Sequence, residues 1–134
     1  MSASEEQIAK AENHFKVHFP QDYQHFLGTE GSTSRFVPPA GDFLTLDSVT
    51  ELAHINEAGN VQERFPGAVV IGGDGSREFL AYDFRQEPPT LALLDTAAPD
   101  WSSAIHQAAS LSALFKQFPE TGWKWDDESE NPPA

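Results

Sequence analysis

Residues 4–27 read SEEQIAKAENHFKVHFPQDYQHFL and encode two helices of different construction. Ser4 and Gln7 have the spacing of a capping box, in which each side chain satisfies a backbone N–H group that the first helical turn leaves unpaired. Apolar residues then recur at helical spacing from Ile8 to Phe15, with charged residues between them. The first half of this stretch is therefore predicted to be an amphipathic helix with one buried face.

Pro20 separates this helix from the next one. Proline disfavours helical geometry at the preceding residue, Phe19, and suits the start of a new helix because it has no N–H group to leave unpaired. An apolar stripe from Tyr23 to Leu27 predicts a second helix that ends before Gly28.

Four apolar runs after these helices are predicted to be strands. They occupy residues 43–46, 68–71, 78–84 and 90–95. Turns alone separate the last three, which predicts an antiparallel meander. The alternation within 78–84 is too mixed to assign one buried side, so we expect both faces of the sheet to be partly covered.

Two further helices are predicted around the strands. One begins at Asp47 or Ser48, either of which can cap it, and ends near Gly59. Ser110 caps the other, which has one apolar stripe and is predicted to end at Pro119.

The segments between these elements differ in character. Residues 28–41 have turn composition and no apolar period, which predicts an exposed loop, and 72–76, GGDGS, are predicted to form a turn. Residues 101–108 fit no single element. The predicted domain spans residues 1–123, and the acidic, proline-containing tail 124–134 is expected to be mobile because it has too little apolar surface to offset the entropy of ordering.

The composition bounds the class of protein. A chain of 134 residues is one domain in length and can remove roughly two-thirds of its unfolded surface from water. It has no cysteine, which excludes disulfides, thiolate zinc sites and cysteine nucleophiles. No apolar run approaches the roughly 20 residues of a membrane span, and no secretory signal precedes the first helix. We therefore expect a cytoplasmic protein.

The net charge is −13, from 21 acidic and 8 basic residues spread over both halves of the chain. This balance disfavours binding to nucleic-acid phosphates. Residues 36–63 contain five acids and neither lysine nor arginine. Such a segment suits a basic partner, although a solvated face that maintains solubility is the simpler interpretation of the charge alone.

Three segments in order resemble the SUKH superfamily, and the resemblance covers residues 4–118. EEQIAKAENHFKVHFPQDYQHFL (5–27) is similar to the family's opening helix pair, VVIGGDGSREFLAYDF (69–84) to its central hairpin, and SLSALF (110–115) to its closing helix. Asp83 takes the acidic position at the end of the aromatic strand.

This resemblance implies a single α+β domain with a central mixed or mostly antiparallel sheet covered by helices. It also implies binding and not catalysis, since most bacterial members are taken to be immunity proteins that neutralise toxins, many of them nucleases, and a fungal relative regulates cell-wall glucan synthesis. The chain departs from the family where Gly28-Thr29-Glu30-Gly31 replaces a frequent Asn-Gly, and where Phe36 or Phe43 replaces a tryptophan. Partner specificity is therefore not carried over from the family.

Histidines and the glycine-rich turn are weak candidates for sites. His14 and His18 have the spacing of two metal ligands on one helical face, but HFKVH lacks the glutamate of a zinc-protease helix and no third ligand is anchored nearby. His25, His54 and His106 are isolated in the sequence. GGDG has one nearby cation and is followed by a strand, which favours a turn over a phosphate loop. We predict no metal and no cofactor.

The tryptophans divide into two groups. Trp101 is predicted to pack in the core. Trp123 and Trp125 lie beside the acidic tail, and both core packing and a role as interface anchors remain open for them.

We predict a non-enzymatic binding domain, an immunity protein that covers a basic toxin by presenting carboxylates where the toxin expects phosphate. No nucleic acid or membrane is expected as a partner. The candidate partner-binding residues are six acids and two loop phenylalanines: Glu30, Phe36, Asp42, Phe43, Asp47, Glu51, Glu57 and Asp74.

Two alternatives remain open. A regulatory scaffold domain that binds a cellular protein without any toxin partner would have the same composition. A hydrolase that uses histidine and carboxylates is least supported, because 21 carboxylates form pairs by chance and Ser102 and Ser103 have no nucleophile elbow around them.

Overall fold

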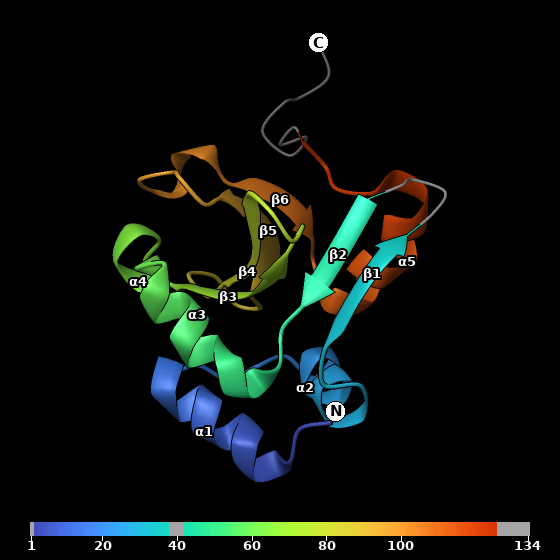
Figure 1. Cartoon of the computed structure of the whole chain (residues 1–134). Helices are drawn as coiled ribbons and strands as arrows, with labels where there is room; N and C mark the ends of the chain where they lie inside the picture. The colour runs from blue at the N-terminus through green and yellow to red at the C-terminus, as the bar shows by residue number, and fades with distance from the viewer. Residues whose placement is uncertain (1, 38–41, 126–134) are drawn as a thin grey trace.

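The opening stretch folds into the two predicted helices. In the computed structural model, which describes residues 2–37 and 42–125, α1 spans Glu5–Phe15 and α2 spans Gln21–Thr29 (Figure 1). Pro20 is the residue that immediately precedes α2, as its chemistry predicts.

The capping box at the start of α1 is confirmed. The Gln7 N–H donates to the Ser4 hydroxyl at 3.1 Å, and the Ser4 N–H donates to the Gln7 side chain at 2.9 Å. The predicted end of α2 before Gly28 is wrong, because the helix continues to Thr29. The Thr29 hydroxyl donates to the His25 carbonyl at 2.9 Å, which satisfies an acceptor in the last turn.

A carboxylate that the sequence did not single out holds the break between the helices. Glu12 accepts a hydrogen bond from the backbone N–H of Phe19 at 2.7 Å, and Lys16 takes a left-handed conformation with φ of 59°. Phe19 is completely buried by the turn that results. The angle between α1 and α2 therefore depends on Glu12 as well as on Pro20.

Six strands form one sheet in which every neighbouring pair is antiparallel and the spatial order follows the chain (Figure 1). The strands are β1 Thr33–Val37, β2 Asp42–Leu46, β3 Ala68–Gly73, β4 Glu78–Asp83, β5 Thr90–Asp95 and β6 Ile105–Ala108. The four predicted strands, the antiparallel meander and the α+β class are confirmed.

Two strands were not predicted. The expectation of an exposed loop over residues 28–41 is wrong for Thr33–Val37, which pair along their whole length with β2. Residues 101–108 divide into a short 3-10 helix, η2, at Trp101–Ser103 and the strand β6 at Ile105–Ala108. In both cases the partner strand supplies the hydrogen bonds, and a local apolar period does not reveal that partner.

Gly72 and Gly73 lie at the end of β3 and not in a turn, so the predicted turn over 72–76 is wrong for these two residues. A Cβ atom at Gly72 would overlap the carbonyl of Thr45 on β2, and one at Gly73 would overlap the carbonyl of Glu78 on β4. Glycine is required here because the neighbouring backbones approach closely.

The remaining helices are η1 Val49–Glu51, α3 Leu52–Ala58, α4 Val61–Arg64 and α5 Leu111–Thr121. Ser110 caps α5 as predicted, since its hydroxyl accepts from the Ala113 N–H at 3.1 Å. The prediction that Pro119 ends this helix is wrong. Pro119 lies in the last turn, where Phe118 is buried and packs edge-to-face against Trp123 with ring centroids 4.7 Å apart, and this packing favours the turn.

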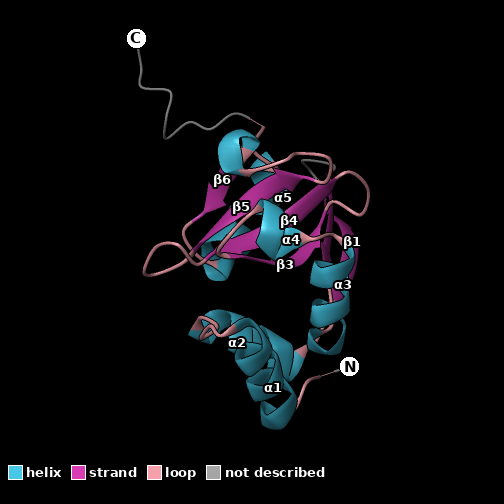
Figure 2. Ribbon diagram, turned by 90° about the vertical axis from the view of Figure 1, so that its left-hand side faces the viewer, coloured by secondary structure: helices cyan, strands magenta, loops and turns pink. Residues whose placement is uncertain are grey.

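Both faces of the sheet are covered, as expected. Figure 2 shows α4 in front of the strands and α1 and α2 packed together below them. The larger core lies between the sheet and the helices α1, α2 and α5. The smaller core lies under α3, α4 and η2, and its buried members are Val61, Phe65, Ala68, Val70, Ala81, Leu94 and Ala98.

The pairing between β2 and β3 is short. It consists of Leu46 with Gly72 and Thr45 with Gly73, and the Asp47 N–H then donates to the Ile71 carbonyl at 2.8 Å. Beyond this point β2 leaves β3, so the rest of that edge of β3 has no strand beside it.

A buried side-chain amide takes the vacated place. Asn56 of α3 donates to the Val70 carbonyl at 3.0 Å and accepts from the Val70 N–H at 2.8 Å, so it pairs with both backbone groups of one strand residue. Its remaining partners are the Leu52 carbonyl at 2.8 Å and the Gln62 side chain at 3.1 Å. The Asn56 side chain is completely buried with all these groups satisfied.

A second buried amide holds the end of the chain. Gln107 of β6 accepts from the Lys124 N–H at 2.8 Å and donates to the Lys124 carbonyl at 2.8 Å. Trp123 donates its backbone N–H to Asp42 at 2.9 Å and its indole N–H to the Phe43 carbonyl at 3.0 Å. Residues 123–124 therefore tie β2 to β6, and most of the predicted mobile tail, 126–134, lies outside the described residues.

Replacing Asn56 by alanine is expected to lower the free energy of unfolding by about 2–4 kcal/mol, because the Val70 N–H and carbonyl would remain buried without partners. Urea denaturation measures this loss. Asn13→Ala, at an exposed position of α1, is the matched control and is expected to change stability by no more than about 0.5 kcal/mol. Equal effects of the two substitutions would contradict this account of Asn56.

Candidate protein-binding site

The β1–β2 hairpin exposes aromatic side chains. Phe36 and Phe43 are directly opposite each other in the hairpin and are 62% and 42% exposed. Opposite residues of an antiparallel pair have side chains on the same face, about 5 Å apart at Cβ. Ser34 and Thr45, two positions further along each strand, are also opposite each other and form the neighbouring pair on that face. We call these four residues the hairpin face.

The strand alternation of β2 explains why this face is open. Leu44 and Leu46 point into the larger core and are 1% exposed, so Phe43 and Thr45 point the other way. On that side of the sheet α3 and α4 cover the central strands, and Figure 1 shows them away from the β1–β2 hairpin. Within the described residues, the smaller core beneath those helices includes no member of β1 or β2.

The tight turn between β3 and β4 borders the hairpin face. A Cβ atom at Gly75 would lie 3.4 Å from the Phe43 ring, so the turn packs beside that ring. Asp74 accepts hydrogen bonds from the backbone N–H groups of Ser76 at 2.9 Å and Glu78 at 3.1 Å. These bonds fix a carboxylate next to Phe43.

Asp42, which precedes Phe43, alternates with it as Leu44 does, so its side chain lies on the opposite side of the hairpin, where it accepts from the Trp123 N–H. A third exposed aromatic, Trp125, follows Trp123 by two residues and is 53% exposed. Core packing and an interface role were both open for Trp123 and Trp125. Trp123 is buried in the larger core, whereas Trp125 is exposed.

The structure brings three of the eight candidate residues together, Phe36, Phe43 and Asp74, and places Asp42 on the same hairpin with its side chain on the opposite side. The other four are on different elements. Asp47 and Glu51 lie between β2 and α3, Glu30 follows α2, and Glu57 near the end of α3 contacts His14 of α1 at 3.3 Å.

Asp47 is the candidate acid whose titration is perturbed. Burial of its half-buried side chain raises the pKa, and the nearby negative charge of Glu51 raises it further. No hydrogen bond to the Asp47 carboxylate is present among the described residues, so ionisation of this group opposes folding.

The acid at the end of β4 has a structural role. Burial alone would raise the pKa of Asp83, but hydrogen bonds from Arg85 lower it below its ordinary value. Arg85 forms two side-chain bonds of 2.9 Å to this carboxylate and stacks on the Trp101 ring at 3.8 Å. The Trp101 indole N–H donates to the Pro66 carbonyl at 2.9 Å. This chain of contacts fastens η2 to the sheet.

One groove combines the residue types of a hydrolase. It has a volume of about 680 Å³ between α2 and α5, and Asp22, His25 and Ser112 line it. Asp22 accepts from the Ser112 N–H at 2.9 Å and from its hydroxyl at 3.1 Å, whereas no described contact joins His25 to either residue. A serine nucleophile needs a histidine between itself and the acid. Asp22 therefore links two helices, and the geometry does not support the hydrolase alternative.

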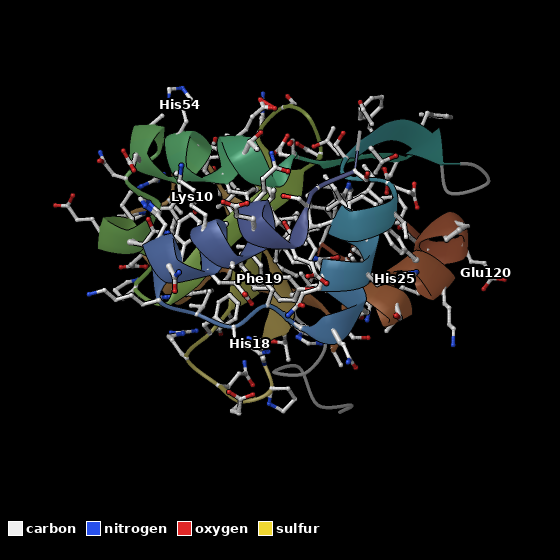
Figure 3. All side chains as sticks on the ribbon, turned by 90° about the horizontal axis from the view of Figure 1, so that it is seen from below. Lys10, His18, Phe19, His25, His54 and Glu120 are labelled. Atoms are coloured by element: carbon white, nitrogen blue, oxygen red, sulfur yellow. The ribbon has the colours of Figure 1, made fainter. Side chains whose placement is uncertain are left out.

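The histidines are also dispersed. Figure 3 shows His18, His25 and His54 on separate parts of the surface. His14 and His18 contact Glu57 and Glu12 at 3.3 and 3.2 Å. In the part of the chain that the structure describes, no three histidine or carboxylate side chains gather to hold a metal ion. Within residues 2–37 and 42–125, no helix has both the length and the apolar character that crossing a bilayer requires.

Sequence reasoning missed three polar side chains that hold backbone segments together. Glu12, Asn56 and Gln107 bind backbone groups 7, 14 and 17 residues away, and the signal that could have found them is weak, because a polar side chain in an apolar stretch is also typical of a solvated face. Phe36 and Phe43 were identified, but not their pairing.

A helix-covered antiparallel sheet with an exposed aromatic hairpin defines a small α+β domain. The chain matches the SMI1 / KNR4 family (SUKH-1) over residues 2–117, and it belongs to that family. Family membership agrees with an immunity-like or regulatory domain that acts through protein–protein contacts and is generally non-catalytic. No curated protein sequence matches the chain.

The Asp47→Asn variant is expected to be more stable than the natural chain at pH 7, by no more than about 1 kcal/mol because solvent screens a half-buried charge. The folded-state pKa of Asp47 is raised, so the charged carboxylate lowers the free energy of unfolding. This destabilisation is fully present above the folded-state pKa and absent below the ordinary aspartate range. The difference should therefore vanish in urea titrations at about pH 3. Glu63→Gln, at an exposed position, is the control, and a pH-independent gain for Asp47→Asn would contradict the assignment.

Proposed function

We propose that this domain is an immunity protein that binds a basic toxin through the β1–β2 hairpin and neutralises it by occlusion, with no chemistry of its own. The observation that carries the proposal is the exposed pair of Phe36 and Phe43, with the fixed carboxylate of Asp74 beside it.

The aromatic pair supports a macromolecular partner. Phenylalanine rings left in water on a rigid strand pair forfeit about 1.5–3 kcal/mol each that burial would recover. Large aromatic residues at the centre of an interface supply much of the binding free energy, while a polar rim excludes water. Asp74 and Thr45 form such a polar rim beside Phe43.

The charge supports a basic partner. The net charge of −13 attracts cationic surfaces over a distance of roughly a Debye length, which increases the association rate. We assign two roles to the candidate acids. Asp74 contacts the partner, whereas Glu30, Asp42, Asp47, Glu51 and Glu57 contribute to its approach. Carboxylates on such a surface would occupy the sites at which a nuclease toxin binds phosphate.

The gene next to this one provides the test. Where it encodes a toxin domain, that domain should form a complex with this chain, and the double variant Phe36→Ser/Phe43→Ser should weaken binding by about 100-fold or more in calorimetry. His25→Ser/His54→Ser removes two exposed rings outside the hairpin and should leave the dissociation constant within about threefold of the natural chain.

Two results would overturn the proposal. Unchanged binding by the phenylalanine double variant would move the interface away from the hairpin. An adjacent gene unrelated to toxins, with a cellular protein bound instead, would assign the regulatory scaffold role.

A further inference from the structure

β1 is an edge strand, and the register shows which of its backbone groups face outward. The Asp47 N–H donates to Ile71 of β3, so the odd-numbered residues of β2 direct their backbone groups toward β3 and the even-numbered ones toward β1. The odd-numbered Phe43 follows this alternation, because its carbonyl accepts from the Trp123 indole N–H and not from a residue of β1.

The same alternation applies to β1. Residues 33, 35 and 37 are opposite Leu46, Leu44 and Asp42, so their backbone groups face β2. The N–H and carbonyl groups of Ser34 and Phe36 therefore face away from the sheet. Both residues are exposed, and no hydrogen bond to these outward groups is present in residues 2–37 and 42–125.

The opposite edge of the sheet is protected, which sets β1 apart. On β6 the Gln107 side chain pairs with Lys124, and the Gln107 carbonyl accepts from Gln117 of α5 at 2.8 Å. Proteins normally cover, shorten or charge their edge strands because an open edge pairs with other chains. An edge left open beside an exposed phenylalanine has the features of a docking site for an extended segment.

We infer that the outer edge of β1 accepts an extended, basic segment of the partner as a seventh strand. This inference rests on the proposed function and specifies how the partner is held. Main-chain bonds to Ser34 and Phe36 supply the pairing, and alternate side chains of the added strand lie on the hairpin face next to the Phe36 ring.

A second copy of this chain fits the edge less well. Two-fold pairing of β1 with itself would bring together two chains of net charge −13. The absence of lysine and arginine from 36–63 favours a cationic strand instead.

A proline at position 34 isolates the outward edge. Because the Ser34 N–H faces away from β2, Ser34→Pro removes no bond of the sheet, and proline is tolerated on edge strands in that orientation. Ser34→Ala is the matched control, since it removes the hydroxyl and keeps the N–H group. Similar thermal unfolding midpoints for the two variants verify that the fold is retained.

The probe is a blocked peptide of alternating lysine and valine, about eight residues long, within the usual length of a strand. NMR titration of the whole chain should move the signals of β1 and β2 and slow amide exchange at Phe36. Binding should weaken at least about tenfold in Ser34→Pro relative to Ser34→Ala. A peptide with glutamate in place of lysine should bind at least about tenfold more weakly than the lysine peptide.

Equal peptide binding by the two Ser34 variants, or signal changes on another surface, would overturn the inference. Should Ser34→Pro unfold, unchanged amide exchange at Phe36 of the natural chain with peptide present would overturn it as well. Peptide addition at β1 without any toxin complex would count against the proposed function alone. A toxin complex unaffected by Ser34→Pro would count against the edge alone.

Discussion

The side-chain amide of Asn56 occupies the place on β3 that a neighbouring strand would otherwise take. It bonds both backbone groups of Val70 while completely buried, and thereby fixes α3 against the sheet where β2 has left it. Gln107 does the same for Lys124 at the opposite end of the sheet. Each amide satisfies backbone groups that would cost roughly 1–3 kcal/mol apiece if left buried and unpaired.

The strand register explains the position of the hairpin. β2 pairs with β3 only through Thr45–Gly73 and Leu46–Gly72, and β3 ends at Gly73, so residues 42–44 and their partner strand β1 extend past the end of β3 and beyond the layer of α3 and α4. Gly72 permits the close approach of β2 at that junction, and Trp123 holds β2 from the core side. The result is a strand pair supported on one face and at one edge, with the other face and edge available to a partner.

Local chemistry predicted much of this fold. The Ser4 capping box, the Pro20 break and the central strands follow from interactions within a few residues, and they are present. The missed features depend on segments far apart in the sequence: β1 requires β2, and Asn56 requires Val70. The candidate site divides in the same way. Exposed phenylalanines and acids could be identified one at a time, but only the register places Phe36 opposite Phe43 and leaves four other acids elsewhere.

Hydrogen exchange of the Asn56 side-chain NH₂ group tests the central claim most directly. If this amide replaces a strand, its protons should exchange only when the whole domain unfolds, with the same opening free energy as the amides of β3 and β4. Exchange as fast as that of the exposed Asn13 side chain would show that Asn56 does not replace a strand at the edge of β3.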